Sequence, residues 1–102
     1  MTDDAKTVLV VDDDPDAREY LSTVLQDNGF TATTANDGVQ AIASLEQQIP
    51  DLVTLDIAMP EKSGVRLYTE LRKDDGLKSI PVIVVTGIQG EIELAHMPPA
   101  AP

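Results

Sequence analysis

Four short stretches of the chain are rich in apolar and β-branched residues. They span residues 7–12, 30–35, 52–56 and 80–86. Two of them contain four consecutive Val, Leu or Ile residues, at 8–11 and 82–85, which is typical of strands buried on both faces. We therefore predict four strands, of which these two are buried on both faces.

Apolar residues recur at helical spacing in the segments that separate these strands. Each segment carries a single apolar stripe, as in a helix that covers one face of a sheet; the segments are residues 16–28, 39–49 and 65–73. Asp14 is placed to cap the first helix, Pro15 suits its first turn and Gly29 suits its end. The alternation of strand and helix predicts an α/β fold with a doubly wound parallel sheet and right-handed crossovers.

The length of 102 residues fits one domain. We expect a disordered N-terminus at residues 1–6, a folded domain at 7–87, and an irregular tail, insertion or linker at 88–102. Within this tail, residues 91–97 have weak helical character, and the prolines beyond them cannot continue a helix.

The net charge of the chain limits the classes of partner that it can bind. Eighteen acidic against seven basic residues give a net charge of −11, which repels phosphate backbones and acidic membranes. We expect no direct nucleic-acid binding from these residues and no membrane association. The absence of cysteine excludes disulfides and thiol catalysis, and no signal for secretion is seen, so a cytoplasmic location is expected.

Three aspartates stand at the ends of predicted strands: Asp12 and Asp13 end the first, and Asp56 ends the third. Ligands of such sheets bind beyond the carboxyl ends of the strands. If these two strands are neighbours, carboxylates about 4 Å apart repel by roughly 4 kcal/mol at an effective dielectric constant of about 20. A divalent cation relieves the repulsion, and oxygen ligands suit Mg²⁺. Two alternatives stay open: protonation of one acid, and acids that are solvated or cap a helix, which we favour for Asp14.

A carboxylate beside Mg²⁺ can also attack a phosphoryl group and form an aspartyl phosphate. Asp56 is the better nucleophile, because it stands alone at its strand end whereas Asp12 and Asp13 share theirs. Thr86, at the predicted end of the fourth strand, is placed to donate a hydrogen bond to a phosphoryl oxygen, a weak signal when taken alone.

These motifs together resemble the receiver domain of two-component response regulators. The resemblance covers about residues 7–87 and rests on motifs that occur in order, namely residues 8–14, 35–41, 56–60 followed by Gly64, and 82–87. It implies a flavodoxin-like fold with strand order 2-1-3-4-5.

The resemblance also implies specific roles. Asp56 would accept a phosphoryl group from a histidine kinase or a phosphotransfer protein, and the domain would signal by a conformational change. Asp13 and Asp56 would bind Mg²⁺ directly, with the backbone carbonyl of Ala58, and Asp12 largely through a water molecule. Thr86 would be the switch hydroxyl. Such a domain is not an enzyme, since it catalyses only its own phosphorylation and dephosphorylation.

The chain departs from the family beyond Gly87. The family's fifth strand, which ends in a Lys-Pro pair, and its fifth helix are not found before Pro102, so we expect the order 2-1-3-4. The lysines present lie outside that context; they are Lys6, Lys62, Lys73 and Lys78. We expect a truncated receiver whose fourth strand is an exposed apolar edge, available for self-association.

Two other functions remain as alternatives. Asp12 and Asp14 form a D-x-D pattern after a strand, as in Mg²⁺-dependent phosphohydrolases of the haloacid-dehalogenase type, but that function gives Asp56 no role and lacks the later lysine and cap domain. The other is an interaction module that works without phosphorylation, with the acids as a remnant.

Overall fold

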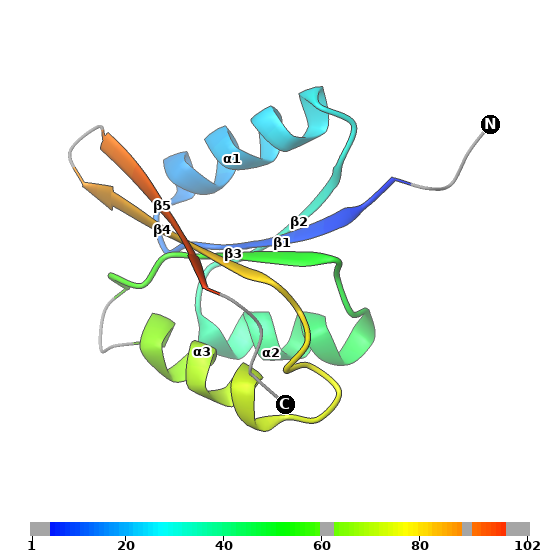
Figure 1. Ribbon diagram of the computed structural model, residues 1–102. Coiled ribbons are helices and arrows are strands. Elements are labelled where there is room, and N and C mark those ends of the chain that lie inside the picture. Colours follow the sequence, from blue (N-terminus) through cyan, green and yellow to red (C-terminus); the bar gives the residue numbers. More distant parts are fainter. Residues whose placement is uncertain (1–4, 60–62, 89–90, 98–102) are drawn as a thin grey trace.

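The computed structural model describes residues 5–59, 63–88 and 91–97, and for residues 86–88 and 91–97 it describes the backbone alone. A five-stranded sheet in the order β2-β1-β3-β4-β5 carries helices on both faces (Figure 1). In chain order the elements are β1 (Thr7–Val11), α1 (Pro15–Asp27), β2 (Thr31–Ala35), α2 (Gly38–Gln47), β3 (Leu52–Leu55), α3 (Ser63–Lys73), β4 (Val82–Ile88) and β5 (Glu91–Met97).

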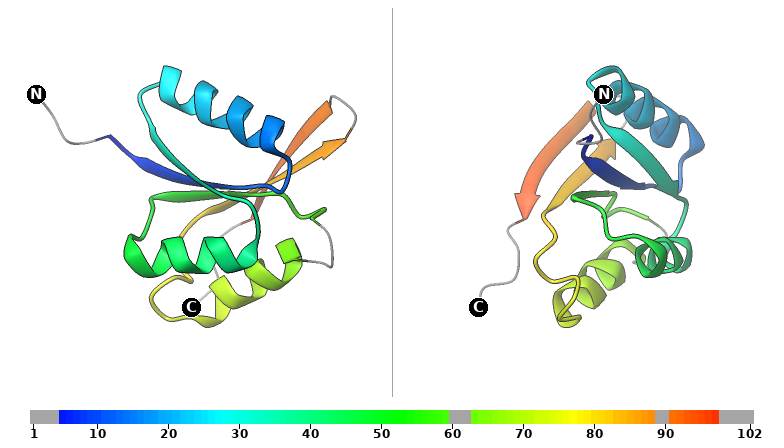
Figure 2. Two further views of the ribbon diagram at one scale, coloured as in Figure 1. Left: turned by 180° about the vertical axis from the view of Figure 1, so that it is seen from behind. Right: turned by 90° about the vertical axis from the view of Figure 1, so that its right-hand side faces the viewer.

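The first four strands form the predicted parallel sheet. β1 pairs with β2 on one side and β3 on the other, and β3 pairs with β4, which confirms the order 2-1-3-4. α1 covers one face, while α2 and α3 lie together on the opposite face (Figures 1 and 2). None of the helices in the described part of the chain has the length and apolar character required to cross a bilayer.

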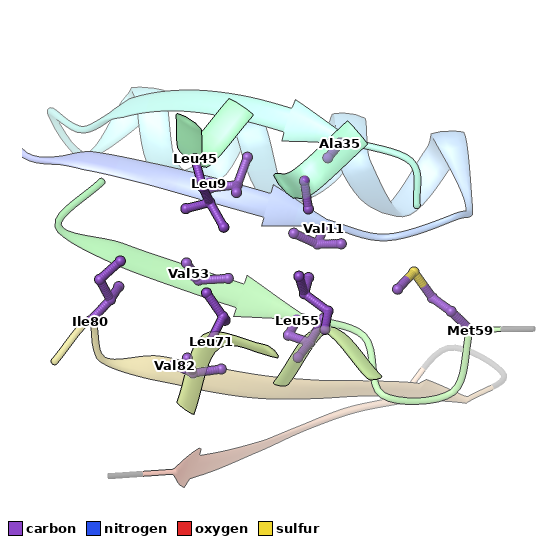
Figure 3. Packing of buried hydrophobic residues seen from close by; sticks show 12 residues of the cluster. Leu9, Val11, Ala35, Leu45, Val53, Leu55, Met59, Leu71, Ile80 and Val82 are labelled. Atoms are coloured by element: carbon purple, nitrogen blue, oxygen red, sulfur yellow. The ribbon is translucent and has the colours of Figure 1, made fainter. Parts of the chain in front are cut away.

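The main hydrophobic core lies between the sheet and the α2/α3 layer (Figure 3). Alternate residues of each strand point to this side, because successive side chains of a strand face opposite ways. Each large aliphatic side chain buried there contributes roughly 1.5–3 kcal/mol. The strand residues of the core are Leu9, Val11, Ala35, Val53, Leu55 and Val82, and the helices add Ala41, Leu45, Leu67 and Leu71.

The first helix starts at the residues predicted from the sequence, and the second is capped in a similar way. Asp14 is the N-cap of α1, where its side chain accepts a hydrogen bond from the Asp16 N–H at 3.0 Å, and Pro15 occupies the first turn. Asp37 caps α2 in the same way, through the Gln40 N–H at 2.8 Å. Gly29 follows α1 with a φ of 90°, the left-handed conformation that glycine adopts without strain.

The prediction for the end of the chain was wrong. β4 does not end at Thr86 but continues to Ile88, and residues 91–97 form β5, antiparallel to β4, in place of a helical or irregular tail. Ile92 and Leu94 alternate with Glu91 and Glu93, a period of two that favours a strand over a helix.

This hairpin also removes the exposed edge. β4 is paired along its length by β5, so the premise for self-association through β4 does not hold. The fifth strand of the described residues differs from the family's parallel one. At the other end, the Lys6 carbonyl accepts the Thr31 N–H at 2.9 Å, so order begins before residue 7. Residues 1–4 and 98–102 lie outside the described residues.

Candidate functional site

The ends of β1 and β3 are held side by side by the parallel ladder. Val11 is opposite Leu55, and the Asp56 N–H donates to the Val11 carbonyl at 3.0 Å. On the other side, the Asp12 N–H donates to the Ala35 carbonyl at 3.1 Å. Because both backbones are fixed at this edge, the acids that follow the two strands are delivered to the same place.

Asp12, Asp13 and Asp56 form a compact acidic cluster. One carboxylate oxygen from each lies within 4.8 Å of the other two. The Asp12 side chain is buried, with 6% of the residue exposed, whereas Asp13 is exposed and Asp56 is half-buried. The sequence-based prediction that these three acids meet at one edge of the sheet therefore agrees with the geometry.

The pKa of Asp12 is shifted by its burial and by its neighbours. Its pKa is raised from 3.8 to about 6, chiefly because burial penalises the charged form. The Asp14 N–H donates to Asp12 Oδ1 at 2.9 Å and acts in the opposite direction, but the negative charges of Asp56 and Asp13 raise the pKa further. A nearby cation would therefore stabilise the charged form of the Asp12 carboxylate.

Arg18 holds the main chain of the cluster. From the second turn of α1, its Nη1 donates to the Asp12 carbonyl oxygen at 2.8 Å. The peptide between Asp12 and Asp13 is thereby fixed from the helix side. Arg18 was not predicted from the sequence, although a basic residue one turn after a cluster of acids was an available signal.

Asp56 is oriented by its own loop. Its Oδ1 accepts the Ala58 N–H at 2.9 Å, which sets the plane of the carboxylate. Gly64, at the start of α3, packs directly on this loop: a Cβ there would lie 2.8 Å from the Ile57 Cα and would also collide with the Asp56 carbonyl oxygen. The absence of a side chain at Gly64 lets α3 approach the acidic residue.

The donor set fits a hard divalent cation. All three side chains offer carboxylate oxygens, which suit Mg²⁺. The raised pKa of Asp12 comes chiefly from its burial, and the neighbouring charges of Asp56 and Asp13 add to it. The carbonyl of Ala58 belongs to an exposed residue of the same loop, two residues after Asp56. These groups together could hold one ion.

The other residues considered for the site lie away from the acidic cluster or have side chains outside the described residues. Asp14 is exposed and serves as the N-cap of α1, as the capping interpretation proposed, so it is not part of the cluster. The backbone of Thr86 pairs with Glu93 of β5, while its side chain lies outside the described residues. Pro60, the last residue of the motif at 56–60, and Lys62 also lie outside them. Lys78 pairs with Asp75 at 3.2 Å, away from the cluster.

Comparison with known proteins gives consistent matches. Residues 8–97 match the response regulator receiver domain family. The probable transcriptional regulatory protein TcrX of Mycobacterium tuberculosis is 42% identical over 80 residues, which cover 78% of this chain and 33% of TcrX.

Solved structures agree. The N-terminal domain of a response regulator receiver protein from Methanoculleus marisnigri superposes with a TM-score of 0.74 at 34% identity, covering 78% of this chain and 64% of that one. The receiver domain of a signal transduction histidine kinase from Syntrophus aciditrophicus gives 0.76 at 33% identity, covering 83% and 64%. The chain thus spans a third of TcrX and less than two thirds of either solved structure.

Proposed function

Because this chain belongs to the response regulator receiver domain family, we propose that it accepts a phosphoryl group on Asp56 from a histidine kinase or a phosphotransfer protein. Receiver domains are signalling domains and generally not enzymes. The observation that carries the proposal is the meeting of three carboxylates at the carboxyl edge of the sheet, with Asp56 oriented by the Ala58 N–H. The same proposal includes a cytoplasmic location, where such a phosphodonor is found.

Each acid has a separate role in this proposal. Asp13, Asp56 and the Ala58 carbonyl would hold Mg²⁺, with Asp12 as the buried supporting charge. When bound, Mg²⁺ supplies positive charge that offsets the charge of the incoming phosphoryl group. Asp56 is the acceptor because its carboxylate is half-buried and held by its own loop, whereas Asp12 is enclosed and accepts the Asp14 N–H.

The transfer itself is a displacement at phosphorus. An oxygen of the Asp56 carboxylate forms a bond to phosphorus as the bond from phosphorus to the imidazole nitrogen of a phosphohistidine breaks. The electron pair of the broken bond remains on the imidazole nitrogen, and Asp56 becomes an acyl phosphate. Alignment of the carboxylate is the main contribution of the chain, because phosphoryl transfer depends mostly on positioning and charge stabilisation.

Thr86 would convert this local event into a signal. We propose that its hydroxyl donates to an oxygen of the phosphorylated Asp56 and that its movement changes the surface around β4 and β5. This role of Thr86 is supported by the position of the residue in β4, the strand next to β3 in the sheet.

The phosphohydrolase alternative loses its basis. A D-x-D motif needs Asp14 beside Asp12 at the reacting centre, but Asp14 caps α1 and its Oδ1 is bonded to the Asp16 N–H. The other alternative, an interaction module that works without phosphorylation, would be favoured if the test below shows no phosphorylation.

The test uses acetyl phosphate as a small phosphoryl donor. The chain is incubated with acetyl phosphate and Mg²⁺, and its intact mass is measured, beside Asp56→Asn and the control Asp14→Asn. The proposal predicts one added phosphoryl group on the wild type and on Asp14→Asn, and none on Asp56→Asn. Equal labelling of all three chains would remove Asp56 from its role, and no labelling of any would favour the interaction module.

A further inference from the structure

A groove of about 830 Å³ opens beside the acidic cluster, between α2 and α3. Its floor is apolar: Met59 and Leu67 are buried beneath it, and Ile42 is half-buried along one side. Val39, in the first turn of α2, forms part of the wall and is 80% exposed. Figure 3 shows Met59 beyond the end of β3, at the edge where the acids gather.

The rim of this groove is acidic. Asp13, Asp37 and Glu70 place three carboxylates around the apolar floor, against the single guanidinium of Arg66. All four residues are exposed, so their charges face an incoming partner. The rim thus has a net charge of about −2 at neutral pH, on a chain whose own net charge is −11.

We propose that this groove docks a basic amphipathic helix of a partner protein. An apolar ridge of the partner would cover Val39 and Ile42, and flanking lysines or arginines would face Asp37 and Glu70. Two helices that flank an open apolar floor match the helix-in-groove mode of recognition, in which anchors recur every three or four residues.

The charge selects among the possible occupants. A nucleic acid or an acidic peptide is repelled by the rim, and so is a second copy of this chain with its net charge of −11. A polar cation alone would leave the apolar floor uncovered. A segment that combines apolar anchors with positive charge satisfies both features.

A first experiment tests the apolar wall. The probe is a fluorescein-labelled amphipathic peptide with leucines at i, i+3, i+4 and i+7 and lysines flanking them, and binding to the full chain is followed by fluorescence anisotropy. Val39→Ser should weaken binding about fivefold, because it removes methyl groups that the peptide buries. The matched control is Val24→Ser on α1, across the sheet, where Val24 is 39% exposed and binding should not change.

A second pair of variants tests the acidic rim. Glu70→Lys and Glu19→Lys make the same change of net charge at exposed positions of α3 and α1. Only Glu70→Lys should weaken binding, by about threefold to fivefold, and Arg66→Glu should strengthen it. Equal weakening by both lysine variants would mean attraction by net charge alone and would overturn the proposal, as would equal binding of a scrambled peptide of the same composition.

This docking requires neither Mg²⁺ nor phosphorylation. Measured without Mg²⁺, peptide binding to Asp56→Asn should equal that of the wild type, because Asp56 does not line the groove. Failure of the peptide to bind any variant overturns the groove proposal and leaves the phosphoacceptor role of Asp56 standing.

Discussion

Two halves of the sheet's carboxyl edge differ in how they are held. At the ends of β1 and β3, parallel pairing and the Arg18 contact fix the backbones of the acids on several sides. At the end of β4, the chain continues past Thr86 and turns back as β5, an edge strand paired on one side. The first half is built for placing charges at a fixed separation. The second half is joined to the first only through the pairing of β4 with β3.

The largest expected effect comes from adding a methyl group at Gly64, where α3 packs against the loop that follows β3. Gly64→Ala would push a Cβ against the Asp56 carbonyl and the Ile57 Cα, and we expect a loss of about 3 kcal/mol in the free energy of unfolding. Denaturant unfolding measures this. The matched control is Gly76→Ala, whose Cβ would meet only the Asp74 side chain at 3.3 Å. An equal, small change in both variants would contradict the close approach of α3.

Mg²⁺ should stabilise the same half. At about a hundredfold excess over its dissociation constant, the ion is expected to raise the free energy of unfolding by about 2.7 kcal/mol. The gain should disappear in Asp13→Asn and persist in Asp14→Asn, because Asp14 caps α1 and lies outside the cluster. Thermal unfolding with and without the ion reports the result, and an unchanged gain in Asp13→Asn would argue against the proposed ligands.

The raised pKa of Asp12 gives a pH dependence of known sign. Between pH about 4 and about 6, the folded chain keeps the Asp12 proton that the unfolded chain has lost, so this group's contribution to stability falls as the pH rises through that window. Without Mg²⁺, Asp12→Asn should therefore be more stable than the wild type at neutral pH, by up to about 3 kcal/mol.

The Asp12→Asn advantage should shrink toward pH 4. Denaturant unfolding of both chains at the two ends of the window measures this difference. A variant that is less stable than the wild type at neutral pH would contradict the charge strain inferred for Asp12.

The smallest effect is expected from a change in the half of the edge formed by β4 and β5. Thr86→Ala should change the Mg²⁺ dissociation constant by less than about twofold, since the proposed ligands all belong to β1, β3 and the loops that follow them. Calorimetric titration makes the comparison, with Asp13→Asn as the variant that loses binding. A loss of affinity in Thr86→Ala as large as that in Asp13→Asn would mean that the two halves of the edge are not separate.

Local signals predicted the parallel part of the sheet well. The apolar runs that became β1 and β4, the cap Asp14 and the order of strands all follow from spacing and side-chain chemistry within short windows. The meeting of Asp12, Asp13 and Asp56 followed as well, because parallel strands place their carboxyl ends at one edge.

The remaining features depend on contacts between distant parts of the chain. The role of Arg18 arises from where α1 crosses β1, and the raised pKa of Asp12 arises from burial, which no local pattern reports. β5 was not predicted, because the alternation in residues 91–94 is short and because a strand is stable only with its partner.

The identity of the phosphorylated residue can be read chemically. After reaction with acetyl phosphate and Mg²⁺, borohydride reduces an acyl phosphate to an alcohol, so a phosphorylated aspartate becomes homoserine. Peptide mass spectrometry then locates the change. We predict homoserine at position 56 and unaltered aspartate at positions 12 and 13; reduction at Asp12 or Asp13 with Asp56 unaltered would contradict the assignment.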